Sequence, residues 1–377
     1  MVSDKFKIVL VAAVLCHTLF AAVLHVEKTG NDDNARSDVS RNTPFLTIQA
    51  AIDSANDGDT IKVGPGVYNT SEHYAESYGK SRIFINKEIT LESTEGRDST
   101  IIEGALHDSE YGLGEDAVRC VCAVTNATIK GFTFRNGATK YGESDSNSVS
   151  GGGLLIPNDV SGGVKELFVL DSRFENCSST RGGGMRRGTA YRTIFKNCYA
   201  LKNGSAVREV KISFCYFEGC GGVNVVAYQT GFQYCTFHKN TPSSSCIHSD
   251  KSTFKVSNCV FASGVSSIEC SSINAVITVE GNVFHNAQKV VTKKEFAGSI
   301  VFSGNRENVW GAGVMSPVFG DMRPYEGGCL DGTGMDLRSS LEAGLDDEDV
   351  MGCKINWTDG PVCPGAFQQV VTPASGR

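Results

Sequence analysis

The sequence is short of proline and of charge. Only 9 of the 377 residues are proline and only 20% are charged, whereas Gly 42 and Phe 20 are high counts. This composition fits a strand-rich secreted chain better than an ordinary helical enzyme. The net charge of -7 argues against nucleic acid or an anionic membrane as partner, because both require a basic surface. A local basic patch is still compatible with that total.

Long apolar runs are missing beyond the N-terminus. Residues 1–22 begin with Lys5 and Lys7, continue with an apolar core from Ile8 to Leu15, and end in small residues at Ala21-Ala22. These are the features of a signal peptide, and we predict one at residues 1–22. The alternative is a retained membrane anchor, because the apolar run is nearly long enough to span. We therefore expect an extracellular or cell-surface protein.

What the sequence does contain is a repeat of phenylalanine. The residues Phe174, Phe195, Phe217, Phe237, Phe261 and Phe284 recur at steps of 21, 22, 20, 24 and 23, with similar neighbours. A period of this length indicates a solenoid, in which each unit buries its apolar face against the next one. Length alone would allow two domains. A solenoid lengthens by adding coils along one axis, so the length of this chain does not require a second domain.

A capping element precedes the repeat. Ile48, Ala51, Ile52 and Ala55 are spaced as the apolar stripe of a short helix, and Thr47 is a suitable N-cap. Residues 59–68 then predict a short strand that ends in a Gly-Pro-Gly turn. One helix ahead of stacked strands would cover the open end of a solenoid.

Residues 23 to about 104 resemble a known group of proteins. The segments HVEKTGNDDN, PFLTIQAAIDSANDGDTIKVGPGVY and STIIEG are similar to the start of secreted β-helix proteins of the pectin-lyase-like superfamily. The central repeats resemble β-helical surface adhesins, and DGPVCPGAFQ resembles the terminus of many secreted β-helix chains. The resemblance implies an all-β fold: a single right-handed parallel β-helix at residues 23–320, with a short N-terminal capping α-helix. A cysteine-containing C-terminal extension, residues 321–377, completes the chain.

Cysteines fall into columns once the phenylalanines are aligned. Three residues after the phenylalanine lie Cys177, Cys198 and Cys220; two before it lie Cys215, Cys235 and Cys259; nine after it lie Cys246 and Cys270. Stacked cysteines permit disulfides, a metal site or buried thiols. Side chains in register on parallel strands point the same way, which disfavours the dihedral angle of a disulfide. The sequence contains no CxxC pair of the kind that binds zinc. We therefore predict buried free thiols. Outside the repeat, Cys329, Cys353 and Cys363 are disulfide candidates.

Candidate site residues are few. The cluster Arg181, Arg186, Arg187 and Arg192 could line one face over two coils and meet an anionic glycan, although solvated turn residues are the simpler interpretation. The loop that contains Asp108, Glu110 and Asp116 offers candidate metal ligands, with a hydrated loop as the alternative. Calcium is expected only if the protein is a lyase. His238, His248 and Asp250 are interpreted as isolated polar residues on turns.

Five sequons predict glycosylation in a eukaryotic secretory route, at Asn69, Asn126, Asn176, Asn203 and Asn356.

Two functions follow as expectations. The first is a secreted or surface-associated, non-catalytic protein that binds extracellular polysaccharide or matrix or serves as a structural or adhesive component, because a stiff repeated surface is what the sequence supplies. The second, implied by the resemblance, is a polysaccharide lyase or related uronate-active enzyme. Whether the protein is an enzyme, which glycan it meets, and its oligomeric state stay open at this point.

Overall fold

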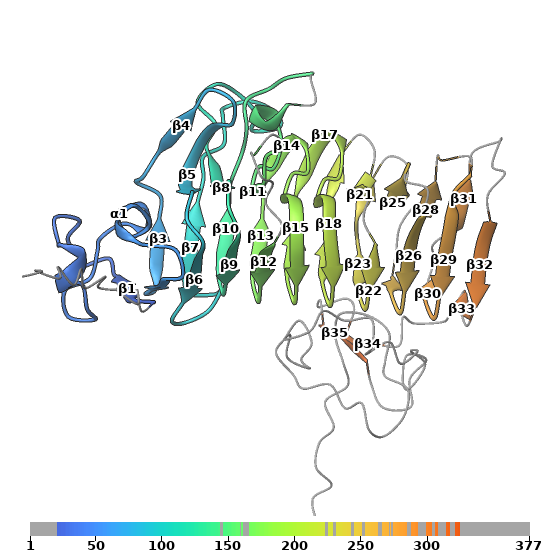
Figure 1. The fold of residues 1–377 in the computed structure, drawn as a ribbon. Helices are drawn as coiled ribbons and strands as arrows, with labels where there is room; N and C mark the ends of the chain where they lie inside the picture. Colours follow the sequence, from blue (N-terminus) through green and yellow to red (C-terminus); the bar gives the residue numbers. More distant parts are fainter. Residues whose placement is uncertain are drawn as a thin grey trace, which may run out of the picture.

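The computed structural model describes residues 21–324, apart from 144–145, 159, 161–165, 223–224, 229–230, 243–244, 251–252, 263–265, 271, 273, 285–287, 293–298, 304–305, 308–313 and 317–320. The described strands stack coil upon coil into one elongated solenoid (Figure 1). Nearly all neighbouring strands run parallel and belong to successive coils. The fold is the predicted right-handed parallel β-helix. Among the described residues, no helix is long and apolar enough to cross a membrane.

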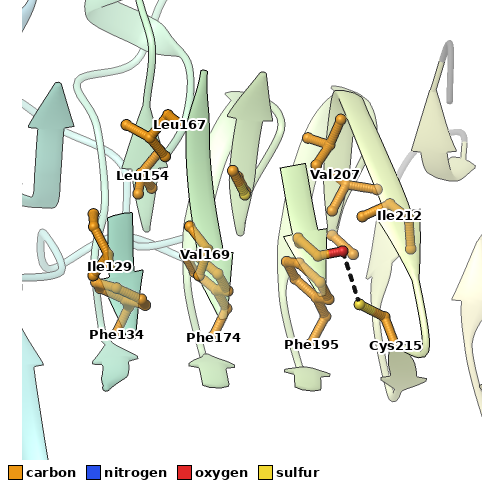
Figure 2. Packing of buried hydrophobic residues seen from close by; sticks show 14 of the residues in the cluster. Ile129, Phe134, Leu154, Leu167, Val169, Phe174, Phe195, Val207, Ile212 and Cys215 are labelled. Atoms are coloured by element: carbon orange, nitrogen blue, oxygen red, sulfur yellow. Dashed lines mark hydrogen bonds between the residues drawn. The ribbon is translucent and has the colours of Figure 1, made fainter. Parts of the chain in front are cut away.

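One stack carries the phenylalanine repeat. Its strands are β3 (Gly66–Tyr68), β7 (Thr100–Glu103), β10 (Thr133–Arg135), β13 (Arg173–Glu175), β16 (Ile194–Lys196), β19 (Tyr216–Glu218), β23 (Thr236–His238), β27 (Val260–Phe261), β30 (Val283–Phe284) and β33 (Arg306–Glu307). The pairing joins each phenylalanine to the next, from Phe134 to Phe284, so the predicted register is confirmed. Consecutive rings stack with centroids 4.6–5.0 Å apart. Phe134, Phe174 and Phe195 form one line inside the coil (Figure 2).

A second, shorter stack follows the first along each coil. It comprises β14 (Ser178–Arg181), β17 (Tyr199–Asn203), β20 (Gly221–Gly222) and β24 (Thr241–Pro242). The corner before it is a single residue with positive φ, at Asn136, Asn176, Asn197, Gly219 and Lys239. Asparagine tolerates this left-handed conformation better than most residues, which accounts for the recurring Phe-x-Asn spacing. The next corner uses Gly151 and Gly182 with φ of 65° and 67°, a conformation that glycine adopts without steric cost.

The third face of the coil is the largest sheet. Its strands are β1 (Val23–Val26), β2 (Thr60–Val63), β4 (His73–Ala75), β5 (Gly79–Ile85), β6 (Ile89–Ser93), β8 (Arg119–Ala123), β9 (Ala127–Lys130), β11 (Leu154–Leu155), β12 (Leu167–Leu170), β15 (Met185–Tyr191), β18 (Val207–Ser213), β21 (Val225–Tyr228), β22 (Phe232–Gln233), β25 (Ser245–Ser249), β26 (Thr253–Ser257), β28 (Ser266–Cys270), β29 (Val276–Glu280), β31 (Gln288–Thr292) and β32 (Ser299–Ser303). Alternate side chains point into the coil, as the strand period requires.

The N-terminal cap has the predicted form. Helix α1 (Ile48–Ser54) buries Ile48, Ala51 and Ile52, and the Thr47 side chain accepts a hydrogen bond from the Ala50 amide at 3.3 Å. Two 3₁₀ turns, η1 (Arg36–Asp38) and η2 (Asn147–Val149), lie in loops. Beyond the last coil, β34 (Val314–Ser316) and β35 (Asp321–Pro324) pair antiparallel. The predicted signal peptide, apart from Ala21 and Ala22, and most of the predicted extension lie outside the described residues.

Cysteines line the inside of the coil as buried free thiols, which confirms the prediction for the described part of the chain. These are Cys120, Cys177, Cys198, Cys215, Cys220, Cys235, Cys246, Cys259 and Cys270. Cys122 is also a buried free thiol, but it lies on the outer side of β8, in register with Leu155 and Arg186. Thiols on the phenylalanine face donate to carbonyl oxygens of the preceding coil, as Cys220 does to Phe195 at 3.5 Å. One predicted column is wrong: Cys270 pairs with Ser249 and not with Cys246. The segment between the phenylalanine and the next strand of the large sheet is shorter in the later coil. A position counted from the phenylalanine therefore falls on different residues of the two paired strands. Cys329, Cys353 and Cys363 lie outside the described residues.

Candidate functional site

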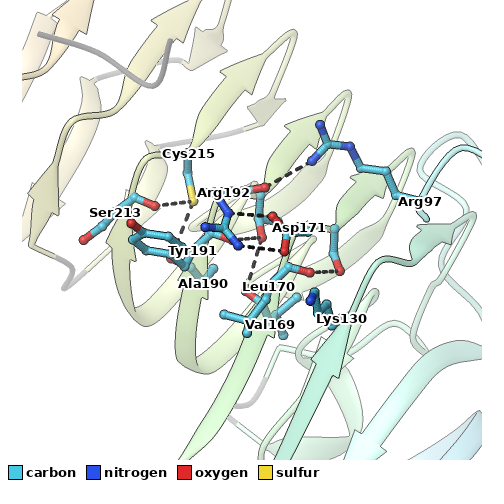
Figure 3. Close-up of polar contacts among 12 residues, drawn as sticks. Arg97, Lys130, Val169, Leu170, Asp171, Ala190, Tyr191, Arg192, Ser213 and Cys215 are labelled. Atoms are coloured by element: carbon cyan, nitrogen blue, oxygen red, sulfur yellow. Dashed lines mark hydrogen bonds and ion pairs between the residues drawn. The ribbon is translucent and has the colours of Figure 1, made fainter. Parts of the chain in front are cut away.

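The predicted arginine cluster does not share one surface. Arg192 forms the corner after β15, with a φ of 49°, and is almost fully buried. Its guanidinium makes two hydrogen bonds to the Asp171 carboxylate, at 2.6 and 2.8 Å, and lies over the Tyr191 ring. Arg97 donates to the Arg192 carbonyl oxygen at 3.2 Å (Figure 3). Arg192 therefore fixes a corner of the coil, and the interpretation as a solvated turn residue is wrong for it.

Arg186 is also buried, for a different reason. Only 1% of the residue is exposed, and its Nη1 donates to the Ser150 hydroxyl at 2.8 Å. Ser150 forms an isolated parallel bridge with Arg181, so two of the predicted arginines lie along the same loop segment. The segment that follows η2 thus covers the beginning of β15.

Arg187 stands on a distortion shared by two strands. Arg187 and Glu209 have positive φ, 68° and 58°, and the pairing of β15 with β18 skips both residues. Their side chains form an ion pair at 2.9 Å. Burial alone would raise the pKa of Glu209, but the hydrogen bond from Arg187 and the charge of Arg208 hold it below its ordinary value. The distortion takes one residue from each strand, so the register is the same before and after it. Residues held in such rarely populated backbone conformations are frequent at functional sites.

The predicted acidic loop is solvent-exposed. Asp108 and Glu110 point into solvent, and Asp116 pairs with His107 in the same loop. Among the residues that the structure describes, no group of three His, Cys, Asp or Glu side chains is arranged to hold a metal ion. The loop therefore presents exposed carboxylates and one His–Asp pair to solvent.

A row of polar side chains crosses five consecutive coils on the outer face of the large sheet. Pairing places Arg186 beside Arg208, Arg208 beside Tyr228, Tyr228 beside His248, and His248 beside Glu269. We call these five residues the polar row. Each follows an inward-facing core residue, namely Met185, Val207, Ala227, Ile247 and Ile268. Alternation along the strand therefore turns every member of the row outward.

Members of the polar row touch one another. The Arg208 guanidinium lies 5.2 Å from the centroid of the Tyr228 ring, which stacks on the His248 ring at 5.4 Å and an interplanar angle of 9°. His248 Nδ1 lies 3.4 Å from Glu269 Oε2. The row thus links a cation, a phenol, an imidazole and a carboxylate through direct contacts. The expectation that His248 is an isolated residue on a turn is wrong, because it lies within β25.

Neighbours on either side hold the row in place. Arg208 Nε donates to Glu209 at 3.2 Å, and its Nη1 donates to Asn203 at 3.1 Å. The Tyr228 hydroxyl donates to Asp250 at 2.7 Å. Burial and this bond to a carboxylate raise the pKa of Tyr228 to about 12, so the phenol stays protonated at neutral pH.

Chemically, the two ends of the row differ. At one end, Arg187, which adjoins the row, and Arg208 both form ion pairs with the single carboxylate of Glu209, and the charge of Arg186 also acts on it, so positive charge is in excess there. At the other end, the side chains of His248 and Glu269 are 14% and 18% exposed, so a ligand can reach both. An imidazole that is oriented by a carboxylate is a group that can accept and return a proton. Sheet strands fix these groups more firmly than loops would.

Sequence reasoning missed the row because its members keep no constant distance from the phenylalanine repeat. They follow the phenylalanine of their coil by 12, 13, 11, 11 and 8 residues. The aliphatic residue before each member, as in Val207-Arg208 and Ile247-His248, could have identified the row. Side chains alternate along a strand, so the residue after an inward-facing aliphatic residue faces outward.

The predicted glycosylation sites differ in their surroundings. Asn69 and Asn176 are exposed. Asn126 joins three coils, because its amide donates to Glu88 at 2.9 Å and accepts from the Glu166 amide at 3.1 Å. Asn203 accepts from Arg208. Asn356 lies outside the described residues. Glycosylation remains a prediction at all five positions.

The chain is similar to known proteins in structure but not in sequence. No protein-family model matches the chain, and no curated protein sequence does. A rhamnogalacturonan lyase is 12% identical over 78% of this chain and 91% of its own, with a TM-score of 0.43. Pectate lyase Pel9A is 14% identical over 93% of this chain and 96% of its own, with a TM-score of 0.43. Pectin methylesterase from carrot is 12% identical over 75% of this chain and 82% of its own, with a TM-score of 0.37. By its own strand pairings, the chain is a right-handed parallel β-helix.

Proposed function

We propose that the protein is an extracellular or cell-surface protein that binds an acidic polysaccharide along the polar row. The observation that carries the proposal is the direct contact of Arg208, Tyr228, His248 and Glu269 across four coils. A row of hydrogen-bonding groups at the strand spacing suits an extended ligand better than a compact one. The predicted signal peptide supports an extracellular encounter.

Charge in the row favours a sugar that carries a carboxylate. Arg187 has 37% of its side chain exposed and is the guanidinium of the positive end that reaches solvent. Guanidinium groups bind carboxylates through paired, charge-assisted hydrogen bonds. His248 and Glu269 at the other end suit the hydroxyl groups of a sugar ring. The ligand would then lie across the strands, with its carboxylate towards Arg187.

Binding is tested with a matched pair of arginine variants. Arg187→Met removes the exposed guanidinium, whereas Arg135→Met removes an arginine with a similar Glu partner at 2.9 Å on β10, away from the row. We expect Arg187→Met to weaken binding of polygalacturonate, alginate or chondroitin about tenfold, as lost charge-assisted bonds require. Arg135→Met should leave the affinity unchanged. Equal affinities for the two variants, or no binding by the unsubstituted protein, would refute the proposal.

One observation favours a second candidate function, eliminative cleavage of the bound chain. The imidazole of His248, oriented by Glu269, could take the proton on the carbon next to the sugar carboxylate. The C–H electrons then form a carbon–carbon double bond as the bond to the glycosidic oxygen breaks. That oxygen leaves with a proton from solvent, while the arginine end of the row, two strands away from His248, holds the carboxylate of a neighbouring sugar of the same chain.

Cleavage is tested by incubation with the same polymers, with and without calcium, and by the ultraviolet absorbance of an unsaturated product. His248→Gln should abolish product formation and retain binding, because glutamine keeps a polar side chain but cannot act as a base. Binding without product in the unsubstituted protein would leave binding as the whole function.

A further inference from the structure

A recess lies on a different stack from the polar row. It has a volume of about 430 Å³ and lies at the corner that leads into the four-stranded stack. The residues that line it are Asn197, Cys198, Tyr199, Gly219, Gly221, Gly222 and Thr241. None of these seven carries a charge, and the volume is within the range of small-molecule sites.

The strand register explains the recess. Tyr199 pairs with Ser178 in the coil before it and with Gly221 in the coil after it. On the side of Ser178, the Tyr111 ring stacks on Tyr199 with centroids 4.8 Å apart, and the Ser178 hydroxyl donates to the Tyr111 carbonyl at 2.7 Å. On the other side, the paired residue Gly221 has no side chain of its own. One face of the Tyr199 ring is therefore covered, and the other borders the recess.

Polar groups surround that open ring face. Asn197 and Thr241 are exposed. A Cβ atom on Gly219 would lie 2.4 Å from Asn197 Oδ1, and one on Gly221 would lie 2.5 Å from Thr241 Oγ1. The amide and the hydroxyl thus lie close to the positions that the two glycines leave free. An amide and a hydroxyl together offer both donors and acceptors to a ligand.

We propose that this recess, the Tyr199 recess, binds the ring of a neutral pyranose sugar. The C–H groups of one sugar face would lie on the Tyr199 ring, whose face is electron-rich. The hydroxyl groups at the sugar's edge would bond to Asn197 and Thr241. An anionic ligand or a metal ion would find no charge among the lining residues, and a wholly apolar ligand would leave the amide and hydroxyl unpaired. The inference does not depend on the function of the polar row.

Saturation-transfer NMR with a panel of neutral methyl pyranosides tests the proposal. We expect saturation of the ring protons of at least one member with the unsubstituted protein. Tyr199→Ala should remove the signal, whereas Tyr199→Phe should keep it. Gly221→Ala should also remove it by adding a methyl group to the recess. Gly221 has no positive φ, so the change does not strain its own φ angle; the added Cβ would instead lie 2.5 Å from Thr241 Oγ1 and displace that side chain.

Two control variants make the result specific. Tyr74→Ala removes a tyrosine that is 65% exposed on β4, and it should leave the signal unchanged. Tyr228→Phe alters the polar row and should also leave the signal unchanged, which separates this proposal from the one above. The proposal is overturned if no pyranoside is saturated, or if Tyr199→Ala and Gly221→Ala both retain the full signal while folded by circular dichroism.

Discussion

At the scale of single residues, Arg119 shows how this fold accommodates a buried charge. Only 1% of it is exposed, and its guanidinium donates to the carbonyl oxygens of Tyr78, Asn147, Ser150 and Gly151 at 2.7–3.1 Å. Burial lowers its pKa to about 10, so it remains charged at neutral pH. Arg119 therefore ties the η2 loop and the turn before β5 to the coil through backbone groups alone.

We predict that Arg119→Met destabilises the protein by about 3 kcal/mol, because four buried carbonyl groups lose a charged donor. Arg82→Met is the matched control. Arg82 also donates to carbonyl oxygens, of Glu103 and Ser71, but is only half-buried, and its loss should cost about 1 kcal/mol or less. Urea unfolding measures both. Similar losses for the two variants would contradict the role given to Arg119.

His238 couples stability to pH. It lies buried on β23, where its Nδ1 is 2.9 Å from the Tyr216 hydroxyl, so the interpretation as an isolated residue on a turn is wrong for it. Burial first, and the charge of Lys239 second, lower the pKa of His238. Below pH 6.5 the unfolded chain therefore binds a proton that the folded chain does not, and stability falls as the pH decreases through that range.

We predict that His238→Gln reduces this dependence, because glutamine does not titrate. Thermal unfolding at several pH values between 7.5 and 5.5 measures it. The unsubstituted protein should lose more stability than the variant over that interval. A variant with an unchanged pH slope would show that other groups determine the acid sensitivity.

At the scale of secondary-structure elements, the thiol columns depend on strand spacing. Each strand stacks on its equivalent, so a small apolar residue at one position recurs in the next coil. Burial in the coil raises the pKa of Cys215 and of Cys246 to about 12. A thiol reacts as its thiolate, so these side chains are protected both by burial and by protonation.

We predict that the ten described cysteines do not react with a thiol reagent in the native state and that all react in denaturant. Alkylation followed by peptide mass spectrometry gives the result for each position. Cys329, Cys353 and Cys363 act as the internal comparison, because the sequence predicts a disulfide among them. Rapid native labelling of Cys198 or Cys220 would contradict their place inside the coil.

The fold could be predicted from the sequence to the level of register, but the candidate site could not. Phenylalanines lie at one fixed position of each coil, so counting from Phe195 to Phe217 finds true neighbours. The corners beyond them vary in length, so counting from the phenylalanine gave the wrong neighbour for Cys270 and did not show that His248 lies in a strand beside Tyr228 and Glu269. The role of Tyr199 could not be predicted either, because the recess depends on a ring face that no other ring covers and not on a sequence motif.

At the scale of the whole molecule, stability is distributed along one axis. Each coil contacts only its neighbours, so the free energy of unfolding is close to a sum over coils and interfaces. Phe195 is fully buried and stacks on Phe174 and Phe217, each at 5.0 Å. Removing its ring damages two interfaces at once and leaves distant coils intact.

We predict that Phe195→Ala costs about 3–5 kcal/mol. Hydrogen exchange should show lost protection in β13, β16 and β19, with little change in β1, β2 and β6. Phe84→Ala is the control, because Phe84 stacks on His73 at the surface of β5 and should cost far less. Uniform loss of protection along the chain would show that the solenoid unfolds as a single unit.

The columns of free thiols also bear on how the protein is made. In the native coil the thiols are enclosed, but they are exposed in the newly made chain until consecutive coils stack. With the predicted signal peptide, that period falls in an oxidising compartment, where exposed thiols form disulfides. A disulfide between two such residues would block coil closure, because the pair could no longer point inward in register. The rate of coil stacking, relative to the rate of thiol oxidation, therefore sets the yield of native protein.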